Sequence, residues 1–293
     1  MKLSFLKITT GLLGAGLFLF SCKKDGNPNN LPDVNPDDYA GKIDGYNSSD
    51  EVYPDNLIAY WSFDDTKNEM VTGTAPSTSA NDTYVTGGVR NKALSLAAGY
   101  VYFPTEFPKF KTDSLKSWSI SLWTKILNNG SKRTMLFQLA RPGIFTGNIN
   151  FQLNTQSFPA TNLTTLRIQP TFSTVGGGTQ DNLNNNLSPS IGMDKWTHIV
   201  LTYEFSTGVF NIWADGVKIG GFPNRGTGNN SFKSYEPNAV IIGSNYNGIP
   251  GMSVNSDVTF APMTGQLDEI RMYNRSLPDA HIKALFNLGI ANK

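Results

Sequence analysis

The sequence has little of the two residue types that most often carry metal or nucleophilic chemistry. Its 293 residues include one cysteine and two histidines. An internal disulfide needs two cysteines, and the common zinc sites and nucleophile–base pairs are built from several Cys or His side chains. We therefore expect neither a disulfide scaffold nor these two kinds of active site.

An excess of charge of one sign is also missing. The chain carries 24 Lys and Arg residues against 23 Asp and Glu residues, a formal net charge of +1, and it contains no basic tract. Proteins that bind nucleic acid use clustered positive charge to neutralise phosphates. We therefore expect no nucleic-acid partner.

Long hydrophobic runs are absent except near the N-terminus. Ile8–Phe20 is an apolar stretch of about 13 residues, which is too short to cross a ~30 Å hydrocarbon core as a helix. Lys2 and Lys7 precede it and Ser21 follows it, which is the arrangement of an export signal. These residues alone leave open an ordinary signal peptide that is cut near Ser21, or a short anchor.

The single cysteine, Cys22, stands directly after this segment. The stretch Leu19-Phe20-Ser21-Cys22 resembles the lipobox of bacterial lipoproteins, which implies a signal peptide over residues 1–21 and a lipid on the Cys22 thiol. Acylation would also remove the free thiol of an exported protein. The following Cys-Lys-Lys-Asp stretch resembles lipoproteins of Bacteroidetes, and this implies a protein lipid-anchored to the outer membrane at the cell surface.

The composition changes at residue 57. Residues 22–56 are rich in Asn, Asp and Pro and show no apolar period, so we expect a lipidated cysteine followed by a disordered tether. From residue 57 onward, β-branched and aromatic residues become frequent. We expect one folded domain over residues 57–293.

The composition of residues 57–293 is typical of strands and turns. Aromatic residues make up 12% of the chain, with 28 Gly and 16 Pro, and short β-branched and aromatic runs alternate with Gly, Asn and Pro clusters. At least ten such runs predict an all-β fold, a two-sheet antiparallel jelly-roll sandwich. The predicted strands cover residues 57–63, 93–96, 100–103, 118–126, 134–139, 149–153, 165–169, 196–205, 209–214, 217–221, 239–243 and 265–273.

One short helix is predicted, at the C-terminal end. Ser276 is placed to cap it, Pro278 suits its first turn, and Gly289 is expected to end it. Asp215-Gly216 is typical of a two-residue hairpin turn between antiparallel strands.

Six segments resemble, in the same order, the laminin-G-like jelly-roll family of the concanavalin A-like lectin/glucanase superfamily. The resemblance extends over about residues 57–290. It implies two packed antiparallel sheets, one of them curved, with glycans bound on the concave sheet or on its rim loops. The fold by itself does not name a function, because it hosts lectins, adhesins, hydrolases and spacers. The six segments are residues 57–64, 91–96, 118–123, 196–203, 209–218 and 265–277.

Glycoside hydrolysis is the less favoured activity. Retaining glycosidases need two carboxyl groups about 5–5.5 Å apart. In residues 265–271, Asp268 and Glu269 are adjacent and therefore point to opposite faces of a strand, while Gln266 stands where a second acid is needed. A pair assembled from distant loops stays open, and such an enzyme would act on O-glycosyl bonds.

The resemblance also implies a structural calcium ion. Asp64 and Asp65 lie in one segment, and Asp268 in another, that help to hold calcium in relatives. Calcium takes six to eight oxygen ligands, so side chains from two strands and loop carbonyls would serve. The alternative is that Asp64 and Asp65 cap a turn and that Asp268 pairs with Arg271 or Arg275.

Sugar sites combine an aromatic platform with groups that make paired hydrogen bonds. On the predicted strand 209–214, Trp213 and Asn211 point away from the apolar face, so Trp213 is the expected platform with Asn211 beside it. Tyr246 and Arg225 lie in Gly- and Asn-rich loops and complete the predicted carbohydrate-binding set. The alternative for Trp213 is packing against a neighbouring loop or strand.

These observations lead to one favoured hypothesis and two alternatives. We expect a cell-surface lipoprotein whose jelly-roll domain binds carbohydrate in a lectin-like way, without catalysis. One alternative is a glycoside hydrolase or an accessory protein of polysaccharide utilisation. The other is a protein-binding subunit that takes part in adhesion or assembly, with a surface protein as its partner.

Overall fold

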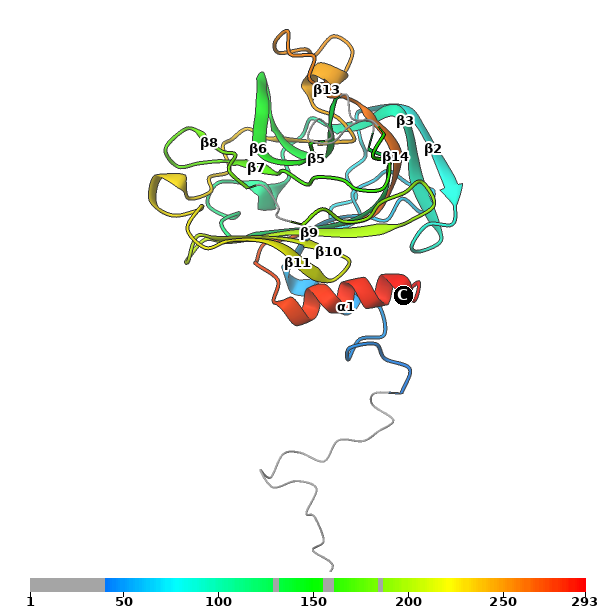
Figure 1. The fold of residues 1–293 in the computed structure, drawn as a ribbon. Helices are drawn as coiled ribbons and strands as arrows, with labels where there is room; N and C mark the ends of the chain where they lie inside the picture. Colours follow the sequence, from blue (N-terminus) through cyan, green and yellow to red (C-terminus); the bar gives the residue numbers. More distant parts are fainter. Residues whose placement is uncertain (1–39, 129–131, 155–160, 184–186) are drawn as a thin grey trace, which may run out of the picture. The chain divides into compact units, whose positions relative to one another are not determined.

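The computed structural model describes residues 40–128, 132–154, 161–183 and 187–293. Within these residues the chain forms mostly antiparallel strands, short 3-10 helices and one α-helix near the C-terminus (Figure 1). The predicted all-β fold class is confirmed. The predicted signal peptide, Cys22 and most of the predicted tether lie outside the described residues. No helix in the described part is long and apolar enough to cross a membrane.

The elements follow one another in the order of their labels in Figure 1, with short 3-10 turns between some of them. The strands are β1 (Leu57–Trp61), β2 (Thr78–Thr86), β3 (Lys92–Phe103), β4 (Trp118–Lys125), β5 (Arg133–Arg141), β6 (Ile144–Leu153), β7 (Thr171–Ser173), β8 (Thr179–Gln180), β9 (Thr197–Glu204), β10 (Val209–Ala214), β11 (Val217–Phe222), β12 (Ala239–Ile242), β13 (Phe260–Ala261) and β14 (Met263–Tyr273). The helices are η2 (Ser49–Glu51), η3 (Pro54–Asn56), η4 (Pro108–Phe110), η6 (Gly228–Asn230), η7 (Tyr246–Gly248) and α1 (Asp279–Ile290).

The strands form one hydrogen-bonded path, in the order β11-β10-β9-β4-β14-β3-β12-β5-β6-β7-β8. β1 pairs with β14 and β2 pairs with β3, while β13 joins β5 as a short parallel pair. The path curls back on itself, so β9 to β11 lie in one layer and β5 to β8 in the facing layer (Figure 1). This arrangement is the predicted sandwich.

Aromatic rings fill the space between the layers. Phe172 of β7 lies 5.3 Å from Tyr203 of β9 and 5.9 Å from Phe210 of β10, measured between ring centroids. Trp61 of β1 lies 5.8 Å from Phe137 of β5 in the same way. All five side chains are fully buried, and each burial of this kind stabilises the fold by about 1.5–3 kcal/mol.

Helix α1 covers the outer face of the β9–β11 layer (Figure 1). Two details of its ends differ from the prediction. Pro278, and not Ser276, is the N-cap residue, and no side chain caps the helix. Gly289 lies inside the helix, where an added Cβ would come 2.3 Å from the Trp123 ring. The glycine is therefore needed for close packing and does not end the helix.

Residues 41–56, which we call the strap, are folded and belong to the same compact unit as the sandwich. Val52 is 1% exposed and packs in one cluster with Ile282 and Leu285 of α1. The backbone N–H of Ser49 donates to the carbonyl of Lys293 at 3.1 Å. The folded unit therefore begins near residue 41, because a few apolar side chains in a polar stretch find a partner in the distant C-terminal helix.

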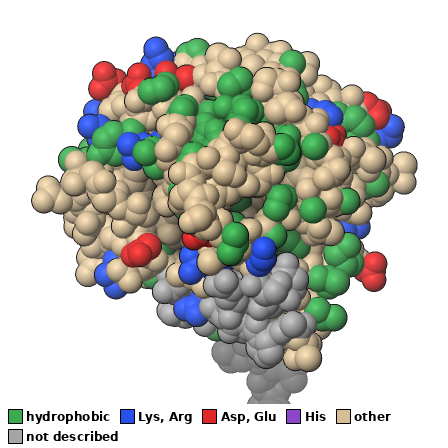
Figure 2. Space-filling model, turned by 90° about the horizontal axis from the view of Figure 1, so that it is seen from above, with side chains coloured by type: hydrophobic (Ala, Val, Ile, Leu, Met, Phe, Trp, Pro, Cys, Tyr) green, Lys and Arg blue, Asp and Glu red, His purple; other side chains and the backbone are tan. Residues whose placement is uncertain are grey.

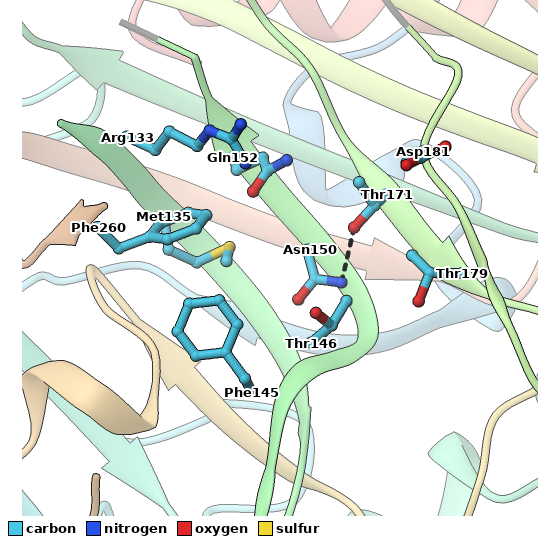
Figure 3. A pocket seen from close by; sticks show the side chains of 10 residues that line it. All are labelled: Arg133, Met135, Phe145, Thr146, Asn150, Gln152, Thr171, Thr179, Asp181 and Phe260. Carbon is cyan, nitrogen blue, oxygen red and sulfur yellow. Dashed lines mark hydrogen bonds between the residues drawn. The ribbon is translucent and has the colours of Figure 1, made fainter. Parts of the chain in front are cut away.

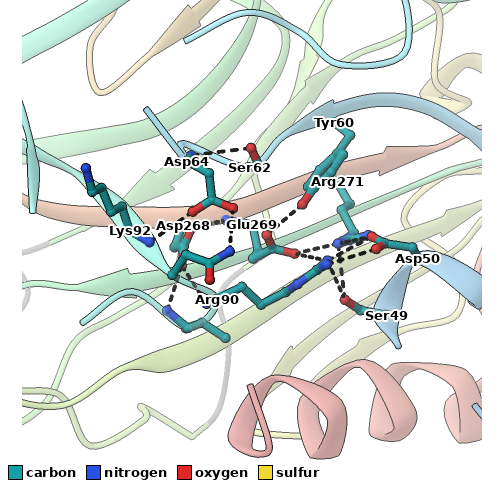
Figure 4. Close-up of polar contacts among 12 residues, drawn as sticks. Ser49, Asp50, Tyr60, Ser62, Asp64, Arg90, Lys92, Asp268, Glu269 and Arg271 are labelled. Carbon is teal, nitrogen blue, oxygen red and sulfur yellow. Dashed lines mark hydrogen bonds and ion pairs between the residues drawn. The ribbon is translucent and has the colours of Figure 1, made fainter. Parts of the chain in front are cut away.

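A buried ionic cluster fastens the strap to the sheet (Figure 4). The Arg271 side chain is 2% exposed, and its Nη2 lies 2.5 Å from a Glu269 carboxylate oxygen and 2.9 Å from an Asp50 oxygen. Arg90 makes two further contacts with the Asp50 carboxylate, at 2.8 and 2.9 Å. The Tyr60 hydroxyl donates to the other Glu269 oxygen at 2.7 Å. Asp50 thus links the strap to two arginines on the sheet side.

Removing the strap should weaken the fold. A fragment 57–293 lacks the Val52 side chain and leaves Arg271 and Arg90 without Asp50. Compared with a fragment 41–293, its free energy of unfolding should fall by at least about 2 kcal/mol, because one buried aliphatic side chain alone contributes about 1.5–3 kcal/mol. Urea denaturation of both fragments measures the difference. Equal midpoints and slopes would show that the strap is not part of the folded unit.

His198 of β9 is a buried structural residue. It is 1% exposed, stacks on Trp123 with ring centroids 4.8 Å apart, and its Nε2 lies 2.8 Å from the Ser121 hydroxyl. Burial, with a smaller effect from the charge of Arg271, lowers the pKa of His198 to about 3. The side chain is therefore neutral in the folded protein at any pH near neutrality.

This shift predicts a loss of stability in acid. A histidine in the unfolded chain takes up a proton near pH 6.5, whereas His198 in the folded chain does not until about pH 3. Its contribution is complete above pH 6.5 and declines as the pH falls toward 3. Between pH 7 and 5 the wild type should lose about 2 kcal/mol more than His198→Asn does. Urea titrations at both pH values test this, and identical losses in the two proteins would contradict it.

Candidate functional site

The outer face of the β5–β7 layer is polar. On β6, Ile149 and Phe151 are fully buried in the core. Side chains alternate along a strand, so Asn150 and Gln152 face the other side of the sheet. Thr171 of β7 pairs with Asn150 across the ladder and faces the same way. Amide and hydroxyl groups therefore gather on one small area outside the core.

A pocket of about 210 Å³ opens over this area (Figure 3). Strands β5, β6, β7, β8 and β13 all contribute to it, so residues far apart in the sequence meet there. The described residues that line it are Arg133, Met135, Phe145, Thr146, Asn150, Gln152, Thr171, Thr179, Asp181 and Phe260.

The floor of the pocket is held rigid by hydrogen bonds. Asn150 Nδ2 donates to the Thr171 hydroxyl at 2.9 Å, and Asn150 Oδ1 accepts from Gln138 Nε2 at 2.8 Å and from the backbone N–H of Gly147 at 2.9 Å. Gln152, in contrast, makes no side-chain hydrogen bond to any residue that the structure describes. A glutamine amide carries both hydrogen-bond donors and an acceptor.

Two half-buried phenylalanines form one wall. The rings of Phe145 and Phe260 meet edge to face, with centroids 5.4 Å apart and planes at 73°. Phe260 belongs to β13, whose parallel pairing with β5 sets Phe260 opposite Arg133. The Arg133 guanidinium carbon lies 5.8 Å from the centroid of the Phe260 ring. Asp181 lies on the far side of the pocket (Figure 3).

Comparison with protein families identifies the fold independently. Residues 97–283, well over half of the chain, match the family model described as the concanavalin A-like lectin/glucanases superfamily. The chain belongs to this superfamily. The curled, mostly antiparallel sheet with two facing layers agrees with the match. A search of the curated proteins finds no match.

Several solved structures have a similar fold. Domain 4 of AbnA, a GH43 extracellular arabinanase from Geobacillus stearothermophilus solved in complex with arabinotriose, aligns with a TM-score of 0.52 and 19% identity, over 78% of this chain and 98% of that one. The binding domain of Paraclostridial Mosquitocidal Protein 1 aligns with a TM-score of 0.53 and 16% identity, over 80% of this chain and 52% of that one. This chain thus spans about half of the toxin domain. At such identities the likeness shows the concanavalin A-like fold and nothing finer.

The aromatic platform expected at Trp213 is not exposed in this concanavalin A-like domain. Trp213 is 5% exposed and packs in the cluster formed with α1, with Lys218 Nζ 4.9 Å from its ring centroid. It does face away from the core, as its alternation with Ile212 requires. That outer face is covered by the helix, so packing against a neighbouring element is the correct interpretation.

The other residues of the predicted sugar site do not meet at one place. Asn211 is half-buried on β10, on the layer that α1 covers. Tyr246 is 4% exposed and packs edge to face on Tyr102, 5.9 Å away between ring centroids. Burial raises the pKa of its hydroxyl well above the usual range. Arg225 is exposed in the loop after β11, where its carbonyl accepts from Gln180 Nε2 at 2.7 Å.

Asp268 is buried and bonded to backbone (Figure 4). Its oxygens accept from the N–H groups of Val89, Arg90 and Glu269 at 2.6, 3.2 and 2.9 Å. Burial, followed by the charge of Glu269, raises the pKa of Asp268 to about 8, although the three N–H donors act in the opposite direction. Arg271 pairs with Glu269, so the alternative pairing of Asp268 with Arg271 is not observed.

The carboxylates of Asp64 and Asp65 also contact nitrogen donors. Asp64 accepts from the Lys92 backbone N–H at 2.9 Å and from Asn91 Nδ2 at 3.1 Å, and Asp65 pairs with Lys92 Nζ at 2.6 Å. Among the described residues, no group of three or more His, Cys, Asp and Glu side chains is arranged to hold a metal ion. In this arrangement Asp64, Asp65 and Asp268 do not fit the calcium site that the family resemblance implies.

The pocket residues were missed by the sequence analysis, although part of the signal was present. The alternation of Asn150 and Gln152 with apolar neighbours marks a polar sheet face. No sequence pattern places Phe260 beside Arg133, because their pairing joins segments 127 residues apart. The site therefore became visible only with the strand order.

Proposed function

We propose that this domain binds carbohydrate, without catalysis, in the pocket over β5 to β8. The observation that carries the proposal is the combination of a rigid amide and hydroxyl floor with a two-phenylalanine wall. Sugar hydroxyls need neighbouring donors and acceptors, which Gln152 and the threonines offer. The apolar C–H faces of a sugar ring need a flat hydrophobic surface, which an aromatic ring offers.

One face of the molecule is mostly uncharged. In the view from above, hydrophobic and uncharged groups make up most of what is visible, and Lys, Arg, Asp and Glu occur in small groups (Figure 2). A partner recognised through a broad charged surface would need a different distribution. Domain 4 of the arabinanase AbnA, similar in fold, was solved in complex with arabinotriose, which supports a sugar as the class of ligand.

The lining favours binding over hydrolysis. Glycoside hydrolases of the usual type need a pair of carboxyl groups that flank the scissile bond. Among the described residues that line the pocket, Asp181 is the one carboxylate. The pocket therefore supports a lectin-like role, by itself or as the sugar-binding part of a polysaccharide-utilisation system.

We further propose that the domain is held at the cell surface by lipid on Cys22. The support is the lipobox-like stretch Leu19 to Cys22 after a short apolar segment, followed directly by polar residues. Stable anchoring takes more than one acyl chain. A lipidated outer-membrane protein of this kind would meet glycans or a surface protein outside the cell.

Loss of the thiol should release the protein from the membrane. Expressed in full length in a bacterium that processes lipoproteins, the wild type should incorporate labelled palmitate and sediment with membranes. Cys22→Ser should take up no label and leave the membrane fraction, because no thioether can form, whereas Ser21→Ala keeps the thiol and should still be labelled. Membrane association of Cys22→Ser equal to that of the wild type would argue against the anchor.

The pocket itself is tested with the soluble fragment 41–293. A glycan array should identify bound oligosaccharides, and Phe260→Ala should weaken that binding about tenfold, since loss of one packed ring corresponds to about 1–2 kcal/mol. Phe205→Ala is the matched control, because Phe205 is 38% exposed in the loop after β9 and does not line the pocket. Calorimetry measures the affinities, and thermal melting checks that both variants are folded.

Two results would contradict the proposal. One is silence of the folded fragment across plant, host and bacterial glycans. The other is sugar binding that neither Phe260→Ala nor Gln152→Ala changes, since both side chains line the pocket.

A further inference from the structure

We propose that the pocket selects acidic sugars, and that Arg133 binds their carboxylate or sulfate group. This inference rests on the proposed carbohydrate binding and names the chemical class of the ligand. It follows from the position of Arg133, from the absence of a counter-charge for it among the described residues, and from the position of Asp181.

Arg133 is held in place by the sheet. It is the first residue of β5, and its backbone N–H donates to the Thr259 carbonyl at 2.8 Å. The parallel pairing with Phe260 brings its guanidinium to 5.8 Å from that ring. Figure 3 shows the guanidinium beside the Gln152 side chain at one end of the pocket. The ring and the strand therefore orient the donors before any ligand binds.

Arg133 has no ion-pair partner among the described residues. Its guanidinium forms no ion pair and no hydrogen bond with the residues that the structure describes, and its Nε is buried without a partner. Arg90 and Arg271, by contrast, pair with Asp50 and Glu269. A guanidinium stays charged at every working pH, and a partly buried cation without a counter-charge is unfavourable. A ligand oxyanion would supply that counter-charge, with two parallel hydrogen bonds in the case of a carboxylate.

The charged residues of the pocket determine the orientation of a bound acidic sugar. Arg133 is the one cation among its described lining residues, and Asp181 lies at the opposite end (Figure 3). The Asp181 carboxylate repels an anion, so the acidic group of a bound sugar is directed toward Arg133. Neutral hydroxyls are left for Gln152, the threonines and Asp181.

The test compares three short ligands of similar length on the fragment 41–293: trigalacturonate, a sulfated galacto-oligosaccharide and galactotriose. At least one of the two acidic ligands should bind at least tenfold more tightly than galactotriose, and this preference should shrink as salt rises. The two acidic ligands separate carboxylate from sulfate, since the planar guanidinium fork matches a carboxylate most closely.

Three variants assign the effect to Arg133. Arg133→Gln should weaken binding of the preferred acidic ligand at least tenfold and leave galactotriose within twofold. Arg133→Lys should fall between, because it keeps the charge but loses the fork. Arg225→Gln removes the same charge from an exposed loop outside the pocket lining and should leave all three affinities unchanged.

The outcomes separate this inference from the proposed function. The acidic preference would be overturned, and sugar binding left in place, if galactotriose bound as tightly as the acidic ligands. In that case Phe260→Ala should abolish the binding and Arg133→Gln should not change it. If Arg225→Gln removed the acidic preference and Arg133→Gln did not, the acidic group would bind outside the pocket. That result would also overturn the assignment of anion binding to Arg133. A folded fragment that binds no sugar, charged or neutral, would overturn both proposals.

Discussion

The packing of two layers of the curled sheet over a shared aromatic core is the constraint on which the rest of the structure depends. Each strand has two faces. The rings of Trp118, Phe172 and Phe210 pack in the core, so one face of each of their strands points inward. Whatever lies between these core residues is then forced outward. On β6 the outward residues are Asn150 and Gln152, so the polar pocket floor is a direct consequence of how the core is packed.

The two outer faces of the sandwich have different roles. The β9–β11 face carries apolar groups such as Val200 and Trp213, and these are covered by α1 and by the strap through Val52. The β5–β8 face carries amides and hydroxyls, and the pocket lies over it. Exposure of an apolar face to water is unfavourable, so other elements cover it, whereas a polar face can line a pocket.

The sequence pattern predicted correctly those strands that depend mainly on neighbouring residues in the chain. The runs at 118–126, 196–205 and 209–214 alternate or are apolar throughout, and each forms a strand at nearly the predicted positions. Strand β2 (Thr78–Thr86) escaped prediction because its sequence is mostly polar, and it pairs only at the edge with β3. Residues 165–169 form isolated bridges in place of the predicted strand, since the apolar run there is short and meets no full-length partner.

The sequence by itself determined the all-β class, the family resemblance, the C-terminal helix and the lipobox-like segment at Cys22, because each depends on residues that are neighbours in the chain. Only the tertiary structure decided that Trp213 is covered, that the folded unit begins near residue 41, and that Arg133 meets Phe260 in a pocket. These outcomes depend on which distant segments pack together. One-dimensional periodicity shows which face of a strand a side chain occupies, but the strand order and the covering elements decide what that face meets.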